Sequence, residues 1–394
     1  YFDGGVHPKT EQEIAALSSY GGEVIFTPGD VVFSSSAFIE LAPPKIAADK
    51  LTTLMNSEEV TLATLRDGVE SLKGISVHVL GDTILDSYVY GSPIGSSATK
   101  TPTLSIKYER QVDFAGGAAI VARHLREAGA EVLFSTVMGD DDHKDFVLQE
   151  MKTHGVRCEA EIDKTRVTTQ KSAYIAGGYR LLKVDRVDNR PISERILEKF
   201  KNALGSSGAD AVVFSDFRHG IFSPATIAQL SAAVPDKAFK VGDSQVASRW
   251  GNILDFHGFD LITPNEREAR FALGDQDSVI RPLALELYKR AKCRTLILKL
   301  GARGILTYRA PNPDVRSFFT VDSFTEKVVD PIGAGDALLA YATLALVATG
   351  SQVIASILGS VAAAIACEHE GNQPVSPAEV LEKLDVLEKQ LDYV

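Results

Sequence analysis

The chain has 394 residues, 45% of them hydrophobic and 24% charged, which is typical of one large globular domain with an additional segment. Its formal net charge of -11 argues against a nucleic-acid-binding protein, because such proteins usually carry a basic surface. The charge does not exclude a small anionic substrate, since that kind of site needs only a local cluster of Lys and Arg. No apolar run reaches the roughly 18–20 residues of a membrane span, so we expect no membrane partner.

The cysteines Cys158, Cys293 and Cys367 lie far apart in the sequence and form no CxxC pair. This spacing predicts neither a zinc cluster nor a disulfide framework, and it favours a reducing cytoplasm as the location. The first residue is Tyr1 rather than Met, which suggests that further sequence precedes it.

The first 43 residues contain a strand-like run at 22–27, a Pro-Gly-Asp turn and a second short apolar run at 31–33. Three serines then stand where an N-cap would open a short helix over 37–41. Apolar residues recur at helical spacing over 45–73, which predicts one helix. We interpret residues 44–74 as a helical linker.

From residue 75 onward, strand-like runs alternate with helical stretches, which predicts an α/β domain over 75–394. We expect three layers, with a mostly parallel sheet flanked by helices. Two segments, about 86–113 and 160–188, show strand-like alternation without intervening helices. They predict a small β-sheet that stands off the core and acts as a lid. The runs expected in the main sheet are 76–80, 131–137, 211–214, 239–241, 261–263 and 295–300.

Two features near the start of this domain are suited to hydroxyl recognition. Asp86 closely follows the first strand, so its carboxylate is expected at the carboxyl edge of the sheet, where open α/β sheets bind ligands. Gly116 and Gly117 introduce a helix that runs through Arg126, and they allow the backbone to come close to a ligand. Taken alone, each feature also fits ordinary turn chemistry.

Residues 263–268 close a strand and open a helix, with Asn265 and Glu268 three apart on one helix face. Such a pair can hold water on Mg²⁺, which prefers oxygen ligands and retains several waters. The alternative is a capping box formed by the same two residues, and both roles are compatible. The stretch from Gly301 to Gly304 joins the strand at 295–300 to another at 305–308, and by itself it fits a hairpin turn.

The strongest motif is Gly333-Ala334-Gly335-Asp336, directly before an apolar helix over 338–347. Glycines at a helix start let backbone N–H groups point at an anion, and the helix dipole adds positive potential there. Asp336 is placed to accept the proton of an attacking hydroxyl. The alternative for an isolated stretch of this kind is an ordinary glycine-rich loop with an N-cap Asp.

In this order the motifs resemble those of the ribokinase-like sugar kinases, also called the phosphofructokinase-B family, over about residues 75–385. Within that family the likeness is to the bacterial heptose-phosphate kinases, and it rests on the stretches 79–91, 180–186 and 214–220. Residues 1–43 look like the tail of a cytidylyltransferase-type nucleotidyltransferase domain. They lack its His-x-x-His-type nucleotide site, so we expect no transferase activity from them.

The resemblance implies an ATP- and Mg²⁺-dependent kinase of a sugar or sugar phosphate, and it implies a role for each matching residue. Asp336 would be the catalytic base, and the backbone of Gly333, Ala334 and Gly335 would form the anion hole. Asn265 and Glu268 would organise Mg²⁺, through water, and the ATP phosphates. The remaining assignments are Lys299, Gly301 and Gly304 along the nucleotide, Gly371 and Asn372 near the adenine side, and Asp86, Gly116 and Gly117 on the sugar. An acceptor phosphate would need cations, for which the lid candidates are Lys100, Lys107, Arg110, Lys171, Arg180 and Lys183.

Two departures from the family pattern leave the acceptor open. Ile120 stands where many members carry a substrate-binding Asn, and Gln245 replaces the Lys of an Asp-Pro-Lys stretch. The alternatives are a nucleoside kinase of the same fold or a non-catalytic sugar or nucleotide sensor. The expected partners are a small-molecule substrate and a second copy of the chain, because relatives often dimerise through lid strands whose exposed edges invite pairing.

Overall fold

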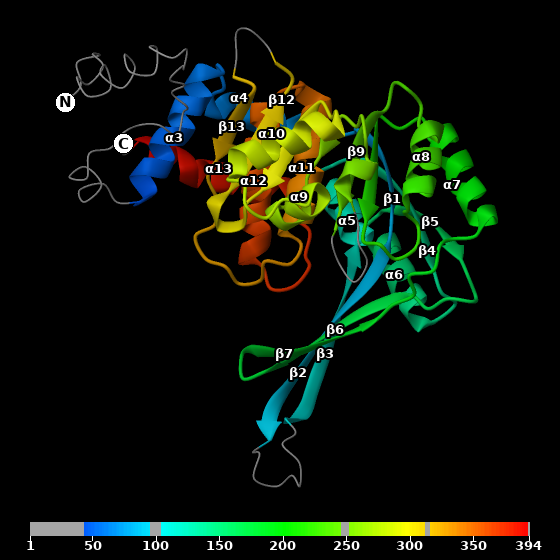
Figure 1. Ribbon diagram of the computed structural model, residues 1–394. Coiled ribbons are helices and arrows are strands. Elements are labelled where there is room, and N and C mark those ends of the chain that lie inside the picture. The colour runs from blue at the N-terminus through cyan, green and yellow to red at the C-terminus, as the bar shows by residue number, and fades with distance from the viewer. Residues whose placement is uncertain (1–42, 95–103, 246–251, 312–315, 393–394) are drawn as a thin grey trace, which may run out of the picture.

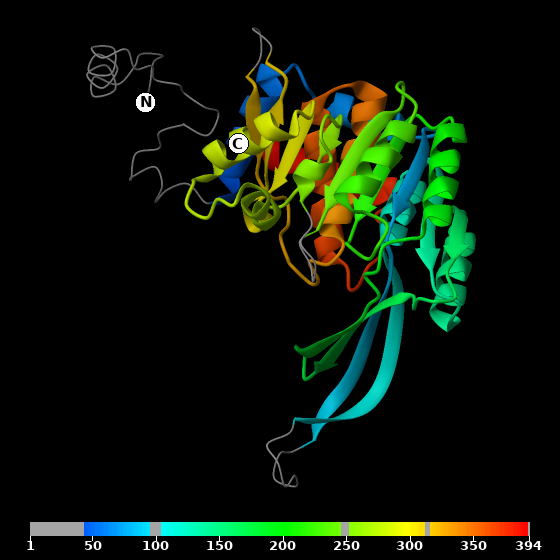
Figure 2. The same cartoon turned by 45° about the vertical axis from the view of Figure 1, so that its right-hand side comes forward.

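The computed structural model describes residues 43–94, 104–245, 252–311 and 316–392. A nine-stranded sheet carries helices on both faces, and a second sheet of four strands projects away from it (Figures 1 and 2). The predicted α/β fold with a mostly parallel sheet is therefore confirmed. The elements expected within residues 22–41, and Lys100, lie outside the described residues.

The large sheet has the strand order β13-β12-β11-β10-β9-β8-β1-β4-β5, and all neighbours are parallel except at β12 and β13. Each strand expected in this sheet forms close to its expected bounds. One expectation was wrong: the lid segment proposed to begin at residue 160 starts inside β5, whose backbone pairs with β4. The strands are β1 (Ser76–Gly81), β4 (Glu131–Met138), β5 (Arg157–Ile162), β8 (Ala211–Asp216), β9 (Phe239–Ser244), β10 (Leu261–Ile262), β11 (Thr295–Lys299), β12 (Ile305–Arg309) and β13 (Phe318–Val321).

Side chains alternate between the two faces of this sheet, because successive residues of a strand point to opposite sides. On β8, Val213 joins the hydrophobic core on one face, whereas Val212 and Phe214 join the core on the other. Both faces are apolar, so both need helices. The first face is covered by α4 (Leu62–Glu70), α5 (Ala118–Glu127), α6 (Asp142–Thr153), α11 (Ala334–Thr349), α12 (Gln352–Glu368) and α13 (Pro377–Asp392). The second is covered by α7 (Glu194–Ser206), α8 (Pro224–Ala233), α9 (Glu266–Leu273) and α10 (Ile280–Ala291).

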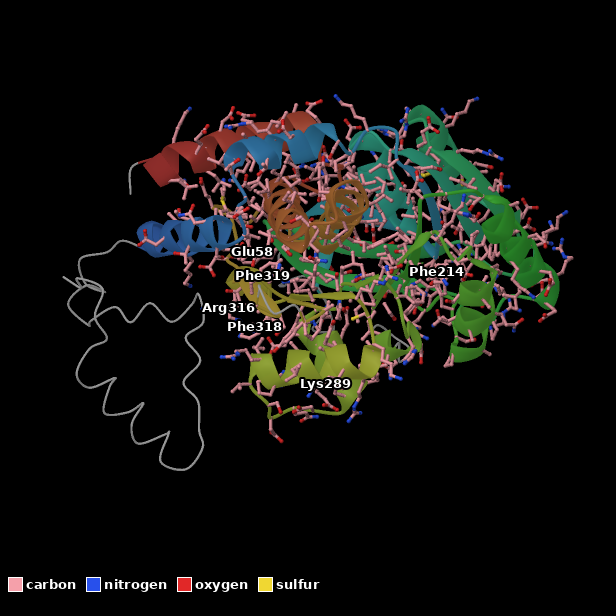
Figure 3. All side chains as sticks on the ribbon, turned by 90° about the horizontal axis from the view of Figure 1, so that it is seen from above. Glu58, Phe214, Lys289, Arg316, Phe318 and Phe319 are labelled. Atoms are coloured by element: carbon pink, nitrogen blue, oxygen red, sulfur yellow. The ribbon has the colours of Figure 1, made fainter. Side chains whose placement is uncertain are left out.

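The single helix expected over 45–73 is two helices, α3 (Pro43–Ser57) and α4. The chain breaks between them because Glu59 takes a left-handed conformation and Thr61 caps α4 in a reciprocal box with Thr64. Glu58, directly after the last residue of α3, binds Arg309 of β12 through both carboxylate oxygens, at 3.0 and 2.6 Å. Figure 3 shows Glu58 beside Phe319 of β13, so α3 lies against this edge of the sheet.

The second sheet consists of β2 (Thr83–Ile94), β3 (Ser105–Gly117), β6 (Thr169–Ala176) and β7 (Tyr179–Arg186), in the order β3-β2-β6-β7. It stands off the large sheet as expected (Figure 1). Its edge strand β7 is exposed along its whole length. No helix in the described part of the chain is both long enough and apolar enough to cross a membrane.

Candidate active site

The candidate site lies at the carboxyl edge of the large sheet. The parallel strands β1, β8, β9, β10 and β11 all end at this edge, and the strand order reverses at β1, between β8 and β4. Such a reversal opens a crevice in which open α/β sheets bind ligands. The sites predicted from sequence come from loops and strand ends that this topology gathers.

Lys299, at the end of β11, is the positive centre of the site. Its ammonium group donates to Asp243 Oδ1 over 2.9 Å, and Thr263 Oγ1 donates to the same oxygen over 2.7 Å. Burial opposes the charge of Lys299, but the carboxylates of Asp243 and Glu268 outweigh it and raise the pKa of the lysine. The sequence analysis did not single out Asp243. Its position at the end of β9, within the stretch compared with Asp-Pro-Lys, was the available signal.

Asp336 lies in the first turn of α11. This helix starts at Ala334, and its N-cap is Gly333. Gly333 has a φ of 84°, which favours glycine, and a Cβ there would collide with Asn372 Oδ1. The Ala334 N–H donates to Pro331 O over 3.5 Å, the limit of a hydrogen bond, so this group is only weakly held. The first-turn backbone of α11 is therefore suited to an anion, with Asp336 beside it.

The carboxylate of Asp336 is buried, with 9% of the residue exposed. Burial raises its pKa to about 8, and the negative charge of Asp243 adds to the effect while Lys299 opposes it. Asp86 and Glu268 raise the pKa of Asp336 further. A carboxyl group with a pKa near the working pH is suited to proton transfer.

Asn265 and Glu268 form the capping box that was weighed as the alternative to metal binding. The Glu268 carboxylate accepts from Asn265 N and Asn265 Nδ2, both over 2.7 Å, and Asn265 Oδ1 accepts from Glu268 N over 2.9 Å. Burial raises the pKa of Glu268 to about 7, against the influence of Lys299. Among the described residues, no group of three or more His, Cys, Asp or Glu side chains is arranged to hold a metal ion directly. Three carboxylates around one lysine still form a site that favours a cation, and waters can complete its shell.

Lys299 also lines a cleft of about 360 Å³. The Gly301–Gly304 stretch is a single turn of 3-10 helix joining the antiparallel strands β11 and β12, so the hairpin interpretation is correct. Both glycines also line the cleft, together with Ala334 and Gly335. Helix α12 supplies an opposite wall that the sequence analysis did not identify, formed by Ser360, Ala363, Ala364 and Cys367.

Ser360 is the polar exception in the apolar wall of this cleft. It is 5% exposed, and its hydroxyl has no hydrogen-bond partner among the described residues. A buried hydroxyl without a partner costs about 1–3 kcal/mol, so one that borders an open cleft is available to a ligand. A single serine within an apolar helix does not indicate a binding site, so Ser360 could not be identified from the sequence.

The residues predicted to hold the sugar lie together beside the first turn of α11. Asp86 is on β2, opposite Phe114 of β3 and Lys171 of β6. A Cβ at Gly116 would collide with Asp86 Oδ2, so a larger residue there would displace the Asp86 carboxylate. Gly117 is the N-cap of α5, with a φ of 63°. Burial raises the pKa of Asp86, and Lys171 opposes that shift.

Gly371 and Asn372, which the resemblance assigns to the adenine side, lie beside Asp86 and Phe114. Asn372 Nδ2 lies 3.4 Å from Asp86 Oδ2, and Gly371 packs so closely on Phe114 that a Cβ would lie 2.5 Å from the ring. The loop after α12 turns toward the small sheet because Gly371 takes a φ of 75° there. The two residues therefore lie beside the residues predicted to hold the sugar, and the buried Asn372 Oδ1 has no hydrogen-bond partner in the described chain.

Four of the predicted lid cations form two groups, whereas Lys107 lies exposed on β3. Burial lowers the pKa of Lys171, and the charges of Lys171 and Lys183 partly offset the rise that burial causes in the pKa of Asp86. Arg110 and Arg180 instead stack on Tyr90 and Tyr88, with 3.9 and 5.5 Å from each guanidinium carbon to the ring centroid. Two further positions bear on specificity. Ile120 is fully buried and offers no hydrogen bond, and Gln245 extends the β8–β9 pairing through its N–H to Asp216 O.

Solved structures share this fold. Phosphofructokinase-2 from Escherichia coli, in complex with fructose-6-phosphate, aligns with a TM-score of 0.64 at 19% identity and covers 80% of this chain and 99% of that one. Arabidopsis thaliana ribokinase, complexed with ribose and ATP, aligns with a TM-score of 0.62 at 18% identity and covers 79% and 99%. At these identities the likeness establishes the ribokinase-like fold.

Sequence relatives are more specific. The bifunctional protein HldE of Pelobacter propionicus is 28% identical over 311 residues, which cover 77% of this chain and 62% of that protein. The bifunctional protein HldE of Caulobacter vibrioides is 30% identical over 318 residues, covering 78% and 63%. The chain thus spans less than two thirds of the length of these relatives. The pfkB family of carbohydrate kinases matches residues 76–379. The chain therefore belongs to the pfkB family of carbohydrate kinases, as its motifs led us to expect.

Proposed function

We propose that this carbohydrate kinase transfers the γ-phosphoryl group of ATP to a hydroxyl of a sugar phosphate, with a heptose phosphate as the expected acceptor. The observation that carries the proposal is the buried carboxylate of Asp336 in the first turn of α11. Its pKa responds both to Asp86, on the acceptor side, and to Lys299, at the nucleotide cleft. The sequence likeness to heptose-phosphate kinases and the relatives named HldE support the choice of acceptor.

In the proposed step an acceptor hydroxyl gives its proton to the Asp336 carboxylate while its oxygen forms a bond to the γ-phosphorus. The bond from that phosphorus to the bridging oxygen breaks, and ADP leaves. The N–H groups of Gly333, Ala334 and Gly335 are the proposed donors to the transferring oxygens, where the dipole of α11 also favours negative charge. Lys299 is the proposed cation along the ATP phosphates.

Mg²⁺, when bound with ATP, neutralises charge on the phosphates and orients them. Asn265 and Glu268 are the residues proposed to organise it through water. Their mutual hydrogen bonds fix the Glu268 carboxylate in place, and the surplus of carboxylates over lysine around it fits a cation. The unpartnered Ser360 hydroxyl is a candidate contact for the nucleotide in the cleft.

On the acceptor side, Asp86 and the backbone at Gly116 and Gly117 are the proposed contacts for sugar hydroxyls. Lys171 is the proposed cation for an acceptor phosphate. Two observations favour an anionic acceptor over a nucleoside. Lys171 and Lys183 both approach Asp86, and burial already lowers the pKa of Lys171, so an added phosphate would stabilise its charge.

A substrate screen tests the proposal. ADP release is measured with ATP and Mg²⁺ in the presence of sugar 7-phosphates, free hexoses, free pentoses and nucleosides. We expect acceptor-dependent turnover with a sugar 7-phosphate. Turnover only with nucleosides would support the nucleoside kinase instead, and ligand binding without turnover would support the sensor.

The base is tested by Asp336→Asn, with Asp145→Asn as a matched control, because the Asp145 side chain is 71% exposed on α6. Loss of a general base lowers the rate by about 10²–10⁴-fold. We expect such a loss for Asp336→Asn, with ATP binding nearly intact by calorimetry, and no change for the control. A fall of less than about tenfold in Asp336→Asn would show that another group accepts the proton.

The assembly is a second part of the proposal. The exposed edge of β7 carries Tyr179 and Leu182, which are 76% and 57% exposed, and an unpaired apolar edge favours pairing with another strand. We propose a homodimer through the lid, and light scattering at micromolar concentration measures it. A monomeric mass would contradict the dimer.

We also propose that residues 1–43 are an inactive transferase remnant. A reducing cytoplasm is the proposed location, and it would keep the free thiols of Cys158, Cys293 and Cys367 reduced.

A further inference from the structure

The carboxylate of Asp330 joins the small sheet to the loop that leads into α11. Its Oδ2 accepts a hydrogen bond of 2.7 Å from the Tyr88 hydroxyl of β2. The same oxygen lies 3.7 Å from Arg180 Nη2 of β7. Its Oδ1 accepts from Ile332 N over 3.2 Å, a short loop closure that ends directly before Gly333. One buried side chain thus contacts both the lid strands and the anion-binding loop.

The contact between Tyr88 and Asp330 is well shielded from water. Tyr88 is 3% exposed and Asp330 is 6% exposed. The Tyr88 ring packs edge-on against Phe114 with 5.4 Å between centroids. A buried hydrogen bond to a carboxylate is stronger than one between neutral groups, whereas the Arg180 pair is longer and its arginine is 41% exposed. We therefore assign most of the coupling to the Tyr88 hydroxyl.

Tyr88 lies on β2, the same strand that carries Asp86. Asp86 precedes Tyr88 by two residues, so the two side chains lie on the same face of the strand. The strand that presents Asp86 to the acceptor side is therefore also the strand that holds Asp330. A shift of β2 toward an acceptor would be transmitted to Asp330, and through Ile332 N to the first turn of α11.

We propose that Asp330 is a positioning residue, and that its hydrogen bond to Tyr88 couples the lid sheet to the anion-binding loop at Gly333–Gly335. With the bond in place, the loop is held in register with the acceptor side. Without it, the loop opens more often and phosphoryl transfer competes less well with transfer to water. The catalytic consequence rests on the proposed kinase function, whereas the mechanical coupling does not.

Tyr88→Phe removes only the hydroxyl and keeps the ring that packs on Phe114. Tyr108→Phe is the matched control, since Tyr108 lies on β3 of the same sheet and is 62% exposed. The first measurement is amide hydrogen exchange of peptides covering residues 328–336. Loss of one hydrogen bond to a charged group is expected to speed exchange there by about tenfold or more in Tyr88→Phe. Exchange in α12 and in the control should stay unchanged. Equal exchange of residues 328–336 in wild type and Tyr88→Phe would overturn the proposal.

The second measurement separates positioning from general loss of structure. With the acceptor that the wild type uses, Tyr88→Phe should lower the rate of acceptor phosphorylation about tenfold while ATP hydrolysis by water, measured without acceptor, does not fall. The ratio of hydrolysis to transfer then rises. A merely structural role would reduce both rates by the same factor, and that result would overturn the proposal. If the wild type phosphorylates no sugar of the screen, the proposed function fails, and the exchange comparison alone decides whether Asp330 couples lid and loop.

Discussion

Asp336 should carry a cost in stability that depends on pH. Burial and the neighbouring charge of Asp243 raise its pKa to about 8, from an ordinary value of 3.8. A carboxyl group whose pKa is higher in the folded state favours folding only while it stays protonated. Its contribution is therefore fully present below the ordinary pKa and is lost as the pH rises toward the folded-state pKa. Asp336→Asn, which removes the ionisation, should stabilise the protein at high pH and do so less at low pH.

The magnitude follows from the shift. One pKa unit corresponds to about 1.4 kcal/mol, so the raised pKa of Asp336 lowers the free energy of unfolding by about 5 kcal/mol at pH 8 and by about 1.6 kcal/mol at pH 5, relative to acid pH. The stability difference between Asp336→Asn and wild type should grow by roughly 4 kcal/mol over this range, as an upper value. Relaxation of the neighbouring carboxylates would reduce it. The lost charge also removes a partner of Lys299, but that interaction is already included in the raised pKa.

The assay is urea denaturation followed by circular dichroism at pH 5, 6.5 and 8, for the wild type, for Asp336→Asn and for Asp145→Asn. We expect the wild-type and Asp336→Asn curves of unfolding free energy against pH to diverge toward pH 8. The control, changed at an exposed site, should run parallel to the wild type. Parallel curves for Asp336→Asn and the wild type would contradict a raised pKa of Asp336, because they would show that this carboxyl group ionises at similar pH in the folded and unfolded states.

Further predictions concern the same site. The acceptor kcat/KM of the wild type should rise with pH toward about 8, where Asp336 loses its proton. Asp243→Asn should move this rise to lower pH by about one unit, because it removes a like charge and frees Lys299. A pH profile that does not move would show that Asp243 has no influence on the pKa of the base. Ser360→Ala should raise KM for ATP about fivefold, with KM for the acceptor unchanged, since it removes one hydrogen-bonding group from the cleft; equal changes in both constants would point to a general packing effect. Glu268→Gln should raise the Mg²⁺ concentration needed for half-maximal rate by about tenfold, and an unchanged requirement would limit Glu268 to its capping of α9.

The fold class and most residues of the candidate site could be predicted from the sequence. Alternating strand and helix patterns predicted the parallel sheet, because a sheet buried on both faces must be apolar on both and needs a helix between successive strands. Glycines at Gly116 and Gly333 marked places where the backbone comes close to another group, and the structure shows a side-chain oxygen at each. Local spacing was sufficient here, since turns and caps depend on residues close together in the chain.

The contacts between these segments could not be predicted from the sequence and became visible in the folded structure. Asp243 of β9 joins Lys299 of β11 across the intervening strand β10, Ser360 borders the cleft from α12, and Asn372 lies beside Asp86. Likewise the hydrogen bond between Tyr88 and Asp330 joins residues 242 positions apart. No periodicity in the sequence records such contacts, because they depend on the strand order and on the path of the loops. The raised pKa of Asp336 belongs to the same class, since burial and neighbouring charges exist only once the chain has folded.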